Sequence, residues 1–176
     1  ELAELVKLLG APTTGTLMGL GAYDSTGRQF IGMLGMHGYY EANLAMQEAD
    51  VVVAVGARFD DRVISVPSKF LATPKKVIHI DVDPSSIAKR VKVNVPIVGD
   101  VKLVLQEMIA LWKEQELMLN PGALEKWWKT IEAWRSRDCM YFDQGDDVIL
   151  PQYVVQTLAK VTGNQAIVTS DVGQHQ

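Results

Sequence analysis

The sequence has one cysteine, no long apolar run and no cluster of basic residues, and each of these absences excludes a class of protein. With Cys139 as its single cysteine, the chain cannot form an internal disulfide or a cysteine-rich metal site. It contains no apolar stretch of about 18 residues and no signal peptide, so the sequence predicts no membrane association. A net charge of −4 without a basic run disfavours a nucleic-acid surface.

The remaining composition is ordinary for a soluble globular protein, at 48% hydrophobic and 22% charged residues. The 176 residues are enough for one full core, or for one domain and part of another. The chain opens on a helical pattern without an initiator methionine and stops shortly after an expected strand. We therefore interpret it as a piece of a longer protein.

The most informative stretch joins an apolar run to a charged loop. Residues 51–55 are all apolar and mostly β-branched, which is typical of a parallel strand buried on both faces. Gly56 permits a sharp turn, and four charged residues follow: Arg58, Asp60, Asp61 and Arg62. The arginines could bind phosphates or carboxylates, and the aspartates could accept from hydroxyls or hold the arginines. A solvated loop with surface ion pairs explains these residues equally well.

A second β-branched run, within residues 75–84, ends in carboxylates. In dinucleotide-binding folds an acidic residue at a strand end accepts hydrogen bonds from ribose hydroxyls, and Asp81 is the candidate for that role. Asp83 precedes Pro84, a pattern typical of a helix N-cap with proline at the first helical position. We therefore interpret Asp83 as a cap.

Helical and strand patterns alternate along the rest of the chain. We expect strands beginning at Pro12 and covering 91–98 and 166–169, irregular segments at 13–21 and 22–33, a short helix within 67–74, and helices over 1–9, 39–49, 101–118, 123–138 and 152–162. Asp100 is the expected N-cap of the helix over 101–118. This alternation predicts an α/β fold: a Rossmann-like parallel sheet with helices on both faces, followed by the start of a second α/β domain.

Three further features have structural explanations. Asn120-Pro121-Gly122 breaks the alternation and is the expected domain boundary. Trp127 and Trp128 favour aromatic packing in a core or at an exposed interface over a cofactor site. His37 lies between two glycines, and we interpret it first as a positioning group and only second as a catalytic residue.

Six segments, taken together and in order, resemble the catalytic large subunits of acetohydroxyacid synthases, also called acetolactate synthases. The segments are TLMGLGAY (16–23), MLGMHGYYEAN (33–43), GARFDDRV (56–63), HIDVDP (79–84), IVGDV (97–101) and DVGQHQ (171–176). The resemblance implies a thiamine-diphosphate enzyme with three α/β domains. Residues 1–119 would be its central FAD-binding domain without the first strand, 120–149 a linker and helix, and 150–176 the start of the thiamine-diphosphate-binding domain.

The resemblance also implies site residues, carried over by motif. Asp61 and Arg62 resemble positions at the mouth of the substrate channel, where herbicidal inhibitors bind. Gln174 and His175 resemble contacts to thiamine diphosphate. The implied FAD contacts are Thr16, Leu17, Leu34, Gly35, Met36, His37, Gly56, Ala57, Arg58, Phe59, Asp60, Asp81, Val82, Asp100 and Val101.

The implied activity is decarboxylation of pyruvate and transfer of its two-carbon unit to pyruvate or 2-oxobutyrate, on the route to valine, leucine and isoleucine. FAD would be structural, and thiamine diphosphate would be held with Mg²⁺. We expect a homodimer with a regulatory small subunit, in the cytoplasm of a bacterium. The activating glutamate and the magnesium-binding segment fall outside this sequence, so we expect no catalytic or metal-binding residue in it. The alternatives are a stand-alone nucleotide- or flavin-binding module and another thiamine-diphosphate oxidase or decarboxylase.

Overall fold

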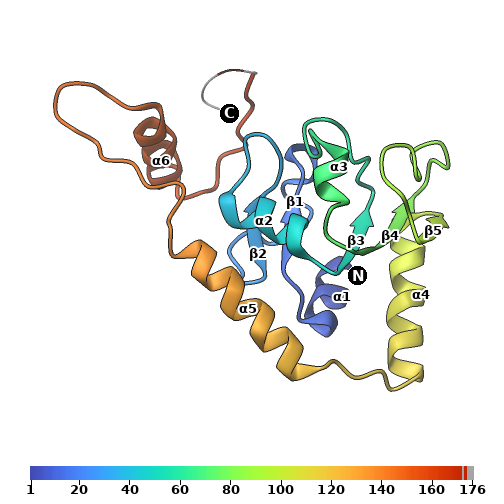
Figure 1. Cartoon of the computed structure of the whole chain (residues 1–176). Helices are drawn as coiled ribbons and strands as arrows, with labels where there is room; N and C mark the ends of the chain where they lie inside the picture. The colour runs from blue at the N-terminus through green and yellow to red at the C-terminus, as the bar shows by residue number, and fades with distance from the viewer. Residues whose placement is uncertain (172, 174–176) are drawn as a thin grey trace. The chain divides into compact units, whose positions relative to one another are not determined.

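The computed structural model describes residues 1–171 and 173, and the chain divides into two compact units, Glu1–Arg137 and Asp138–Gln176 (Figure 1). The first unit alternates helices and strands. Its elements are α1 (Leu2–Leu9), β1 (Thr13–Gly15), the 3-10 helix η1 (Leu17–Gly19), β2 (Phe30–Met33), α2 (Tyr40–Glu48), β3 (Val51–Val55), α3 (Pro67–Phe70), β4 (Lys76–Asp81), β5 (Val95–Val98), α4 (Val101–Glu114) and α5 (Pro121–Arg135). The second unit contains α6 (Pro151–Val161).

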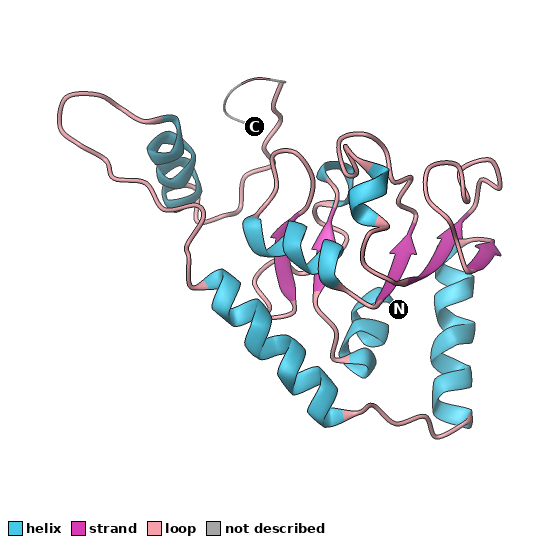
Figure 2. Cartoon of the chain, in the orientation of Figure 1, coloured by secondary structure: helices cyan, strands magenta, loops and turns pink. Residues whose placement is uncertain are grey.

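The strands of the first unit form two parallel sheets. One pairs β1 with β2, and the other has the order β3-β4-β5. In the second sheet Val53 lies opposite Ile78, and Ile80 opposite Ile97. Figure 2 shows the arrows pointing the same way. The carboxyl ends of all these strands therefore lie along one edge, where parallel α/β sheets bind ligands.

Side chains along β4 alternate between two apolar clusters. Ile80 packs with Leu5 of α1 and with Leu105 of α4 on one face. Val77 packs with Phe70 of α3 on the other face, in a cluster that Met46 of α2 also touches. Helices thus cover both faces of the three-stranded sheet. The predicted α/β class, with a parallel sheet and helices on both faces, is confirmed.

The two helices on the first of these faces are tied by polar contacts at their surface. The Lys113 ammonium lies 2.7 Å from the Glu4 carboxylate, and Gln106 donates to the Glu1 carboxylate at 2.9 Å. Asp100 accepts from the backbone N–H of Leu103 at 3.2 Å, which confirms the predicted N-cap. The α4 helix ends at Glu114, short of the expected residue 118.

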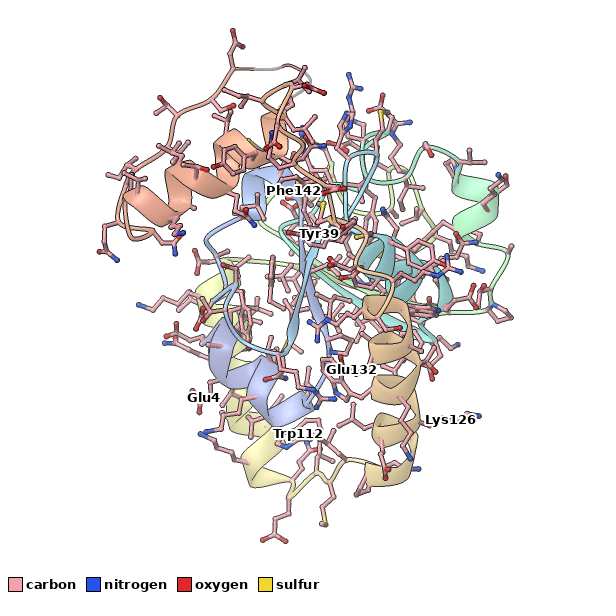
Figure 3. All side chains as sticks on the ribbon, turned by 90° about the vertical axis from the view of Figure 1, so that its left-hand side faces the viewer. Glu4, Tyr39, Trp112, Lys126, Glu132 and Phe142 are labelled. Atoms are coloured by element: carbon pink, nitrogen blue, oxygen red, sulfur yellow. The ribbon has the colours of Figure 1, made fainter. Side chains whose placement is uncertain are left out.

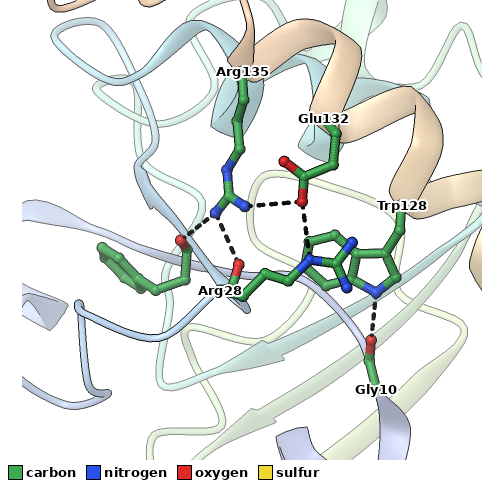
Figure 4. Close-up of polar contacts among 6 residues, drawn as sticks. Gly10, Arg28, Trp128, Glu132 and Arg135 are labelled. Carbon is green, nitrogen blue, oxygen red and sulfur yellow. Dashed lines mark hydrogen bonds and ion pairs between the residues drawn. The ribbon is translucent and has the colours of Figure 1, made fainter.

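Helix α5 packs against α2 and the two-stranded sheet, and covers the apolar side chains of both. Trp128 and Ile131 are buried with Ile31 of β2 and Ala42 of α2. The Trp128 indole donates to the Gly10 carbonyl at 2.8 Å (Figure 4). With 6% of its surface exposed, Trp128 belongs to the core, and Trp127 packs on the same cluster. The predicted aromatic packing is therefore confirmed as packing in a core and not at an exposed interface, because the α5 face carrying these rings turns inward.

Polar contacts hold the carboxyl-terminal half of α5 on the start of β2. One Arg135 nitrogen donates to the carbonyls of Arg28 and Phe30 at 2.8 and 2.7 Å, and another contacts Glu132 at 3.3 Å. Glu132 also pairs with Arg28 at 3.0 Å, and the Arg28 guanidinium stacks over the Trp128 ring (Figure 4). Figure 3 labels Glu132 and Lys126 on opposite sides of this helix.

Four sequence-based expectations about elements were wrong in part. Strand β2 lies inside the segment 22–33 expected to be irregular, and the strand expected over 91–98 begins at Val95. No helix follows Asp83; turns do, and Ala88 has a φ of 58°, which a right-handed helix cannot contain. Residues 166–169 form no strand, because no strand of the described residues pairs with them.

In the second unit, the described helix α6 has no buried residue. Its apolar residues Tyr153, Val154, Val155, Leu158 and Val161 are all more than a third exposed. Among the residues the structure describes, no helix is long and apolar enough to cross a membrane.

Replacing Ile131 with alanine should destabilise the first unit by about 2–5 kcal/mol, because it leaves a cavity under a fully buried side chain. Lys129→Ala, on the exposed face of the same helix, should change stability by less than about 0.5 kcal/mol. Urea unfolding of the two variants measures both values. Equal small effects would show that α5 does not fold with residues 1–119.

The Glu4–Lys113 pair predicts an acid-dependent contribution to stability. The hydrogen bond and charge of Lys113 hold the pKa of Glu4 below its ordinary value of 4.5. Because the folded pKa is the lower one, the contribution is present above pH 4.5 and is lost as the pH falls through the folded pKa. Lys113→Met should therefore lower the melting temperature at pH 7, and the difference from wild type should shrink towards pH 3. A difference independent of pH would contradict this.

Candidate cofactor-binding site

The candidate site is the edge of the sheets at which the parallel strands end. Residues 16–20 follow β1, 34–38 follow β2, 56–63 follow β3, 82–86 follow β4 and 99–101 follow β5. All fifteen implied FAD contacts lie in these loops or at the adjoining strand and helix ends. The sheet topology therefore brings to one edge residues that are up to 85 positions apart in sequence, from Thr16 to Val101.

The loops after β2 and β3 touch through their backbones. Met36 donates its N–H to the Arg62 carbonyl at 2.8 Å. The side-chain amide of Asn43, from α2, bonds both the N–H and the carbonyl of Gly35, at 2.8 and 2.9 Å. Gly35 has a φ of 106°, and a Cβ added there would lie 2.5 Å from the Arg62 carbonyl oxygen. Glycine is therefore required at the point where these two loops meet.

A buried aromatic ring anchors the loop after β3. Phe59 has a φ of 52°, is 3% exposed, and meets the His79 ring edge-on with centroids 5.2 Å apart. It also contacts Phe70 of α3 at 6.0 Å. The φ of Phe59 is strained for a bulky side chain, so its burial must stabilise this turn. As a result, the neighbouring residues Arg58 and Asp61 are exposed.

Asp60 organises this loop and is also paired with an arginine. Its Oδ1 accepts from the backbone N–H groups of Arg62 and Val63, both at 3.2 Å. Its other oxygen lies 3.5 Å from Arg58, whose side chain is 72% exposed. The sequence left open whether this is a ligand-binding loop or a solvated loop with surface ion pairs. The structure has one such pair at the surface, Arg58–Asp60, and the Asp60 carboxylate also shapes the turn.

The predicted ribose-binding residue, Asp81, is buried at the end of β4. Its Oδ1 accepts from the N–H of Asp83 at 2.8 Å, and its carbonyl accepts from Gly99 of the next loop at 3.0 Å. Asp83 is exposed and accepts from Ser85 and Ser86, and the hydrogen bonds from Ser85 lower its pKa. Asp83 therefore caps a turn, and Asp81 is the buried carboxylate at the carboxyl end of β4.

The other loops add a hydroxyl, a helix start and exposed apolar side chains. Thr16 accepts from the N–H of Gly19 at 3.1 Å and so closes η1. Asp100 caps α4, and Val101 is that helix's first residue. Exposed apolar side chains accompany them, namely Leu17, Met18, Leu20, Met36, Val82 and Val98. An edge with loop amides, a carboxylate and apolar side chains suits a ligand with a flat ring and a polar chain.

Some predicted residues are not brought into this arrangement. His37 is exposed. Gln174 and His175 lie outside the described residues. No group of three or more histidine, cysteine or acidic residues that could hold a metal ion occurs in the part of the chain the structure describes. The hollow lined by Arg28, Trp128 and Glu132 lies on α5, away from the strand ends, and its charges pair with one another.

Sequence reasoning missed two residues that shape the site. Asn43 was predicted only as part of a helix. Its side-chain amide can bond both backbone groups of Gly35, eight residues earlier, only because that helix packs back against the loop. His79 was read as one member of a strand run. It is fully buried, its ring nitrogens have no hydrogen-bond partner among the residues that the structure describes, and it supports Phe59. Neither role has a local sequence signal.

Comparison with known proteins identifies the family to which the chain belongs. Residues 1–108 match the family model described as thiamine pyrophosphate enzyme, central domain. The whole chain is 49% identical to the acetolactate synthase large subunit of Haemophilus influenzae and 47% identical to the large subunit of acetolactate synthase isozyme 3 of Escherichia coli. It is 41% identical to the acetolactate synthase of Mycobacterium leprae. The chain spans 28–30% of the length of these proteins.

Gly35→Ala should destabilise the first unit by about 2–4 kcal/mol, because the new methyl group meets the Arg62 carbonyl and the backbone is left-handed. Gly56→Ala is the matched control: its φ is 63°, but nothing lies within 4 Å of the added Cβ. We expect about 1–2 kcal/mol there. Thermal unfolding of both variants measures the difference, and equal losses would mean that the two loops do not meet as described.

Proposed function

The chain belongs to the thiamine pyrophosphate enzymes, and from that premise we propose that it is part of the large subunit of an acetolactate synthase. The single observation that carries this proposal is identity of 41–49%, extending over the whole chain, to proteins of that name from three bacterial species. The parent protein would transfer the two-carbon unit of pyruvate to pyruvate or 2-oxobutyrate. That reaction serves the synthesis of branched-chain amino acids.

The strand-end edge would bind FAD. Support comes from the loops that converge there and from Asp81, a buried carboxylate at the end of the second strand of its sheet, where dinucleotide-binding folds hold ribose. The exposed side chains Leu17, Met36 and Val82 would contact the flat ring system. These residues fit the cofactor, and their work would be to bind and orient it.

The charged loop after β3 would face the substrate side of this edge. Arg58 is mostly exposed although it pairs with Asp60, so its guanidinium retains donors for a phosphate or carboxylate. Asp61 and Arg62 follow on the same loop and are also exposed. Because Phe59 anchors the loop from below, these three side chains would be presented at the mouth of a channel to 2-oxoacid substrates.

The parent's thiamine diphosphate would supply the electron sink for decarboxylation. Gln174 and His175 are the residues of this chain proposed to contact it, and Mg²⁺ would be held by residues beyond this sequence. The relatives' designation as large subunits supports a regulatory small subunit as partner, and the large subunit would form a homodimer. A cytoplasmic bacterial enzyme is consistent with the bacterial relatives.

Titrating the chain with FAD should quench flavin fluorescence and raise the melting temperature, because a ligand that binds only the folded state stabilises it. Asp81→Ala should weaken FAD binding about tenfold or more, the effect of losing one charged hydrogen bond of about 1.5–3 kcal/mol. Asp83→Ala is the control, since the Asp83 side chain accepts from Ser85 and Ser86 in the following turn, whereas Asp81 is the buried carboxylate at the end of β4. Equal affinities of the two variants would remove Asp81 from the FAD site.

The activity is tested on the full-length protein, with thiamine diphosphate, Mg²⁺ and FAD present. Acetolactate formed from pyruvate would support the proposal. Acetaldehyde or acetyl phosphate in its place would identify a decarboxylase or oxidase of the same family.

A further inference from the structure

His79 is a buried titratable group that the candidate site does not use. Its side chain, on β4, is fully buried, and neither ring nitrogen has a hydrogen-bond partner in the part of the chain that the structure describes. A neutral imidazole carries one donor and one acceptor, so burying both without partners costs free energy. An apolar ring at this position would avoid that cost. Core packing alone therefore does not explain a histidine here.

The His79 ring is part of the support beneath the loop after β3. It meets the Phe59 ring edge-on, with the ring centroids 5.2 Å apart and an angle of 86° between the planes. Phe59 also contacts Phe70 of α3, at a centroid distance of 6.0 Å. Because a φ of 52° is strained for a bulky residue, the loop keeps this conformation only while the Phe59 ring stays buried. Removing the His79 ring from its place would therefore release the turn.

Two charged groups lie in the interior close to the His79 ring. The Asp81 side chain is two residues further along the same face of β4, and its carboxylate accepts from the Asp83 N–H and not from the imidazole. From the segment before β4, the Lys75 ammonium lies over the Phe70 ring, 4.2 Å from its centroid. Since Asp81 and Lys75 have opposite charges, their effects on a charge at His79 oppose each other.

The other charged side chains of the surrounding elements are already paired or turned to solvent. Asp60 pairs with Arg58 and accepts from the backbone of its own turn. The exposed ones, on α2, α3, β4 and the loops around them, are Glu48, Asp50, Arg58, Asp61, Arg62, Lys69, Lys76, Lys89, Arg90 and Lys92. A proton on the buried His79 ring would therefore have no acceptor among the described residues, and burying such a charge costs far more than burying the neutral ring.

We propose that His79 makes the loop after β3, residues 56–63, acid-sensitive: the neutral ring holds the loop closed through Phe59, and a protonated ring leaves its place and lets the loop open. The closed form buries the ring and the open form exposes it to water, so the open form binds more protons. The ratio of open to closed loops therefore rises as the pH falls below about 6.5, where an exposed histidine takes up a proton. Acid then displaces Arg58 and Asp61 from the strand-end edge. This inference concerns the position of the loop and is independent of the proposed activity.

A pH titration of the chain followed by NMR tests the protonation of His79 against that of the exposed His37. The range above about pH 5 leaves aspartate carboxylates ionised. The imidazole signals of His37 should titrate near pH 6.5, about the value for an exposed histidine. Those of His79 should change only together with the amide signals of Arg62 and Val63, which bond the Asp60 carboxylate. A His79 ring that takes up its proton together with His37, while these amide signals stay unchanged, would overturn the proposal.

Amide hydrogen exchange measures how far the loop opens. The N–H groups of Val63 and Ile64 both donate to the backbone carbonyl of Asp60. Their protection, corrected for the intrinsic pH dependence of exchange, should fall about 30-fold between pH 7.5 and pH 5, the change in the open-to-closed ratio that one proton taken up near pH 6.5 produces. The amide of the buried residue Leu105, within α4, should keep its protection. Equal protection of the loop amides at both pH values would contradict the proposal.

Substitution of the two histidines separates the proposed role from a purely structural one. His79→Phe keeps a ring against Phe59 and cannot take up a proton, so the 30-fold loss of protection should disappear. His37→Gln, at the exposed histidine, should retain the loss. The melting temperature at pH 7.5 shows whether each variant folds, and His79→Leu serves in place of His79→Phe if the larger ring is not accommodated. A loss of protection that persists in a folded variant without His79 would overturn the proposal, because another group would then respond to pH.

Discussion

The parallel pairing of β3 with β4 is the constraint on which the rest of the first unit depends. It orients the two strands so that Gly56 and Asp81 end at the same edge, and it sends alternate side chains to opposite faces. Ile80 then reaches the cluster with α1 and α4, and His79 reaches Phe59. Both the core and the candidate site follow from this one register. A shift of one residue would exchange the two faces.

The loop after β3 shows how packing beneath the sheet edge positions polar groups above it. Phe59 is held in a strained turn by the rings of His79 and Phe70. The Lys75 ammonium stacks over Phe70 and donates to the carbonyls of Met46 and Gln47, at the end of α2, and this burial lowers its pKa. Contacts beneath the strand-end edge therefore determine where Arg58 and Asp61 lie.

Sequence predicted the elements whose signals are local. The β-branched runs of β3 and β4, the Asp100 cap and the periodic helices α1, α4 and α5 all have such signals, and they were confirmed. Strand β2 was missed because its four residues contain a glycine and follow a turn-rich segment. Its conformation depends on pairing with β1 and on the cover provided by α5, neither of which is visible in a short window of sequence.

The candidate site was predictable where a motif marks a strand end, but its geometry was not. Residues 34–37 and 56–60 were identified from their motifs, yet the contact between Gly35 and Arg62 requires the loops of two different sheets to meet. The same reasoning explains why β3 looks central in sequence and open in structure. Its side chains are suited to the faces of a complete sheet, and its pairing depends on a neighbour. The apolar residues of a strand therefore predict that its two faces are suited to burial. The hydrogen-bond register shows which of its two edges is paired in the described residues.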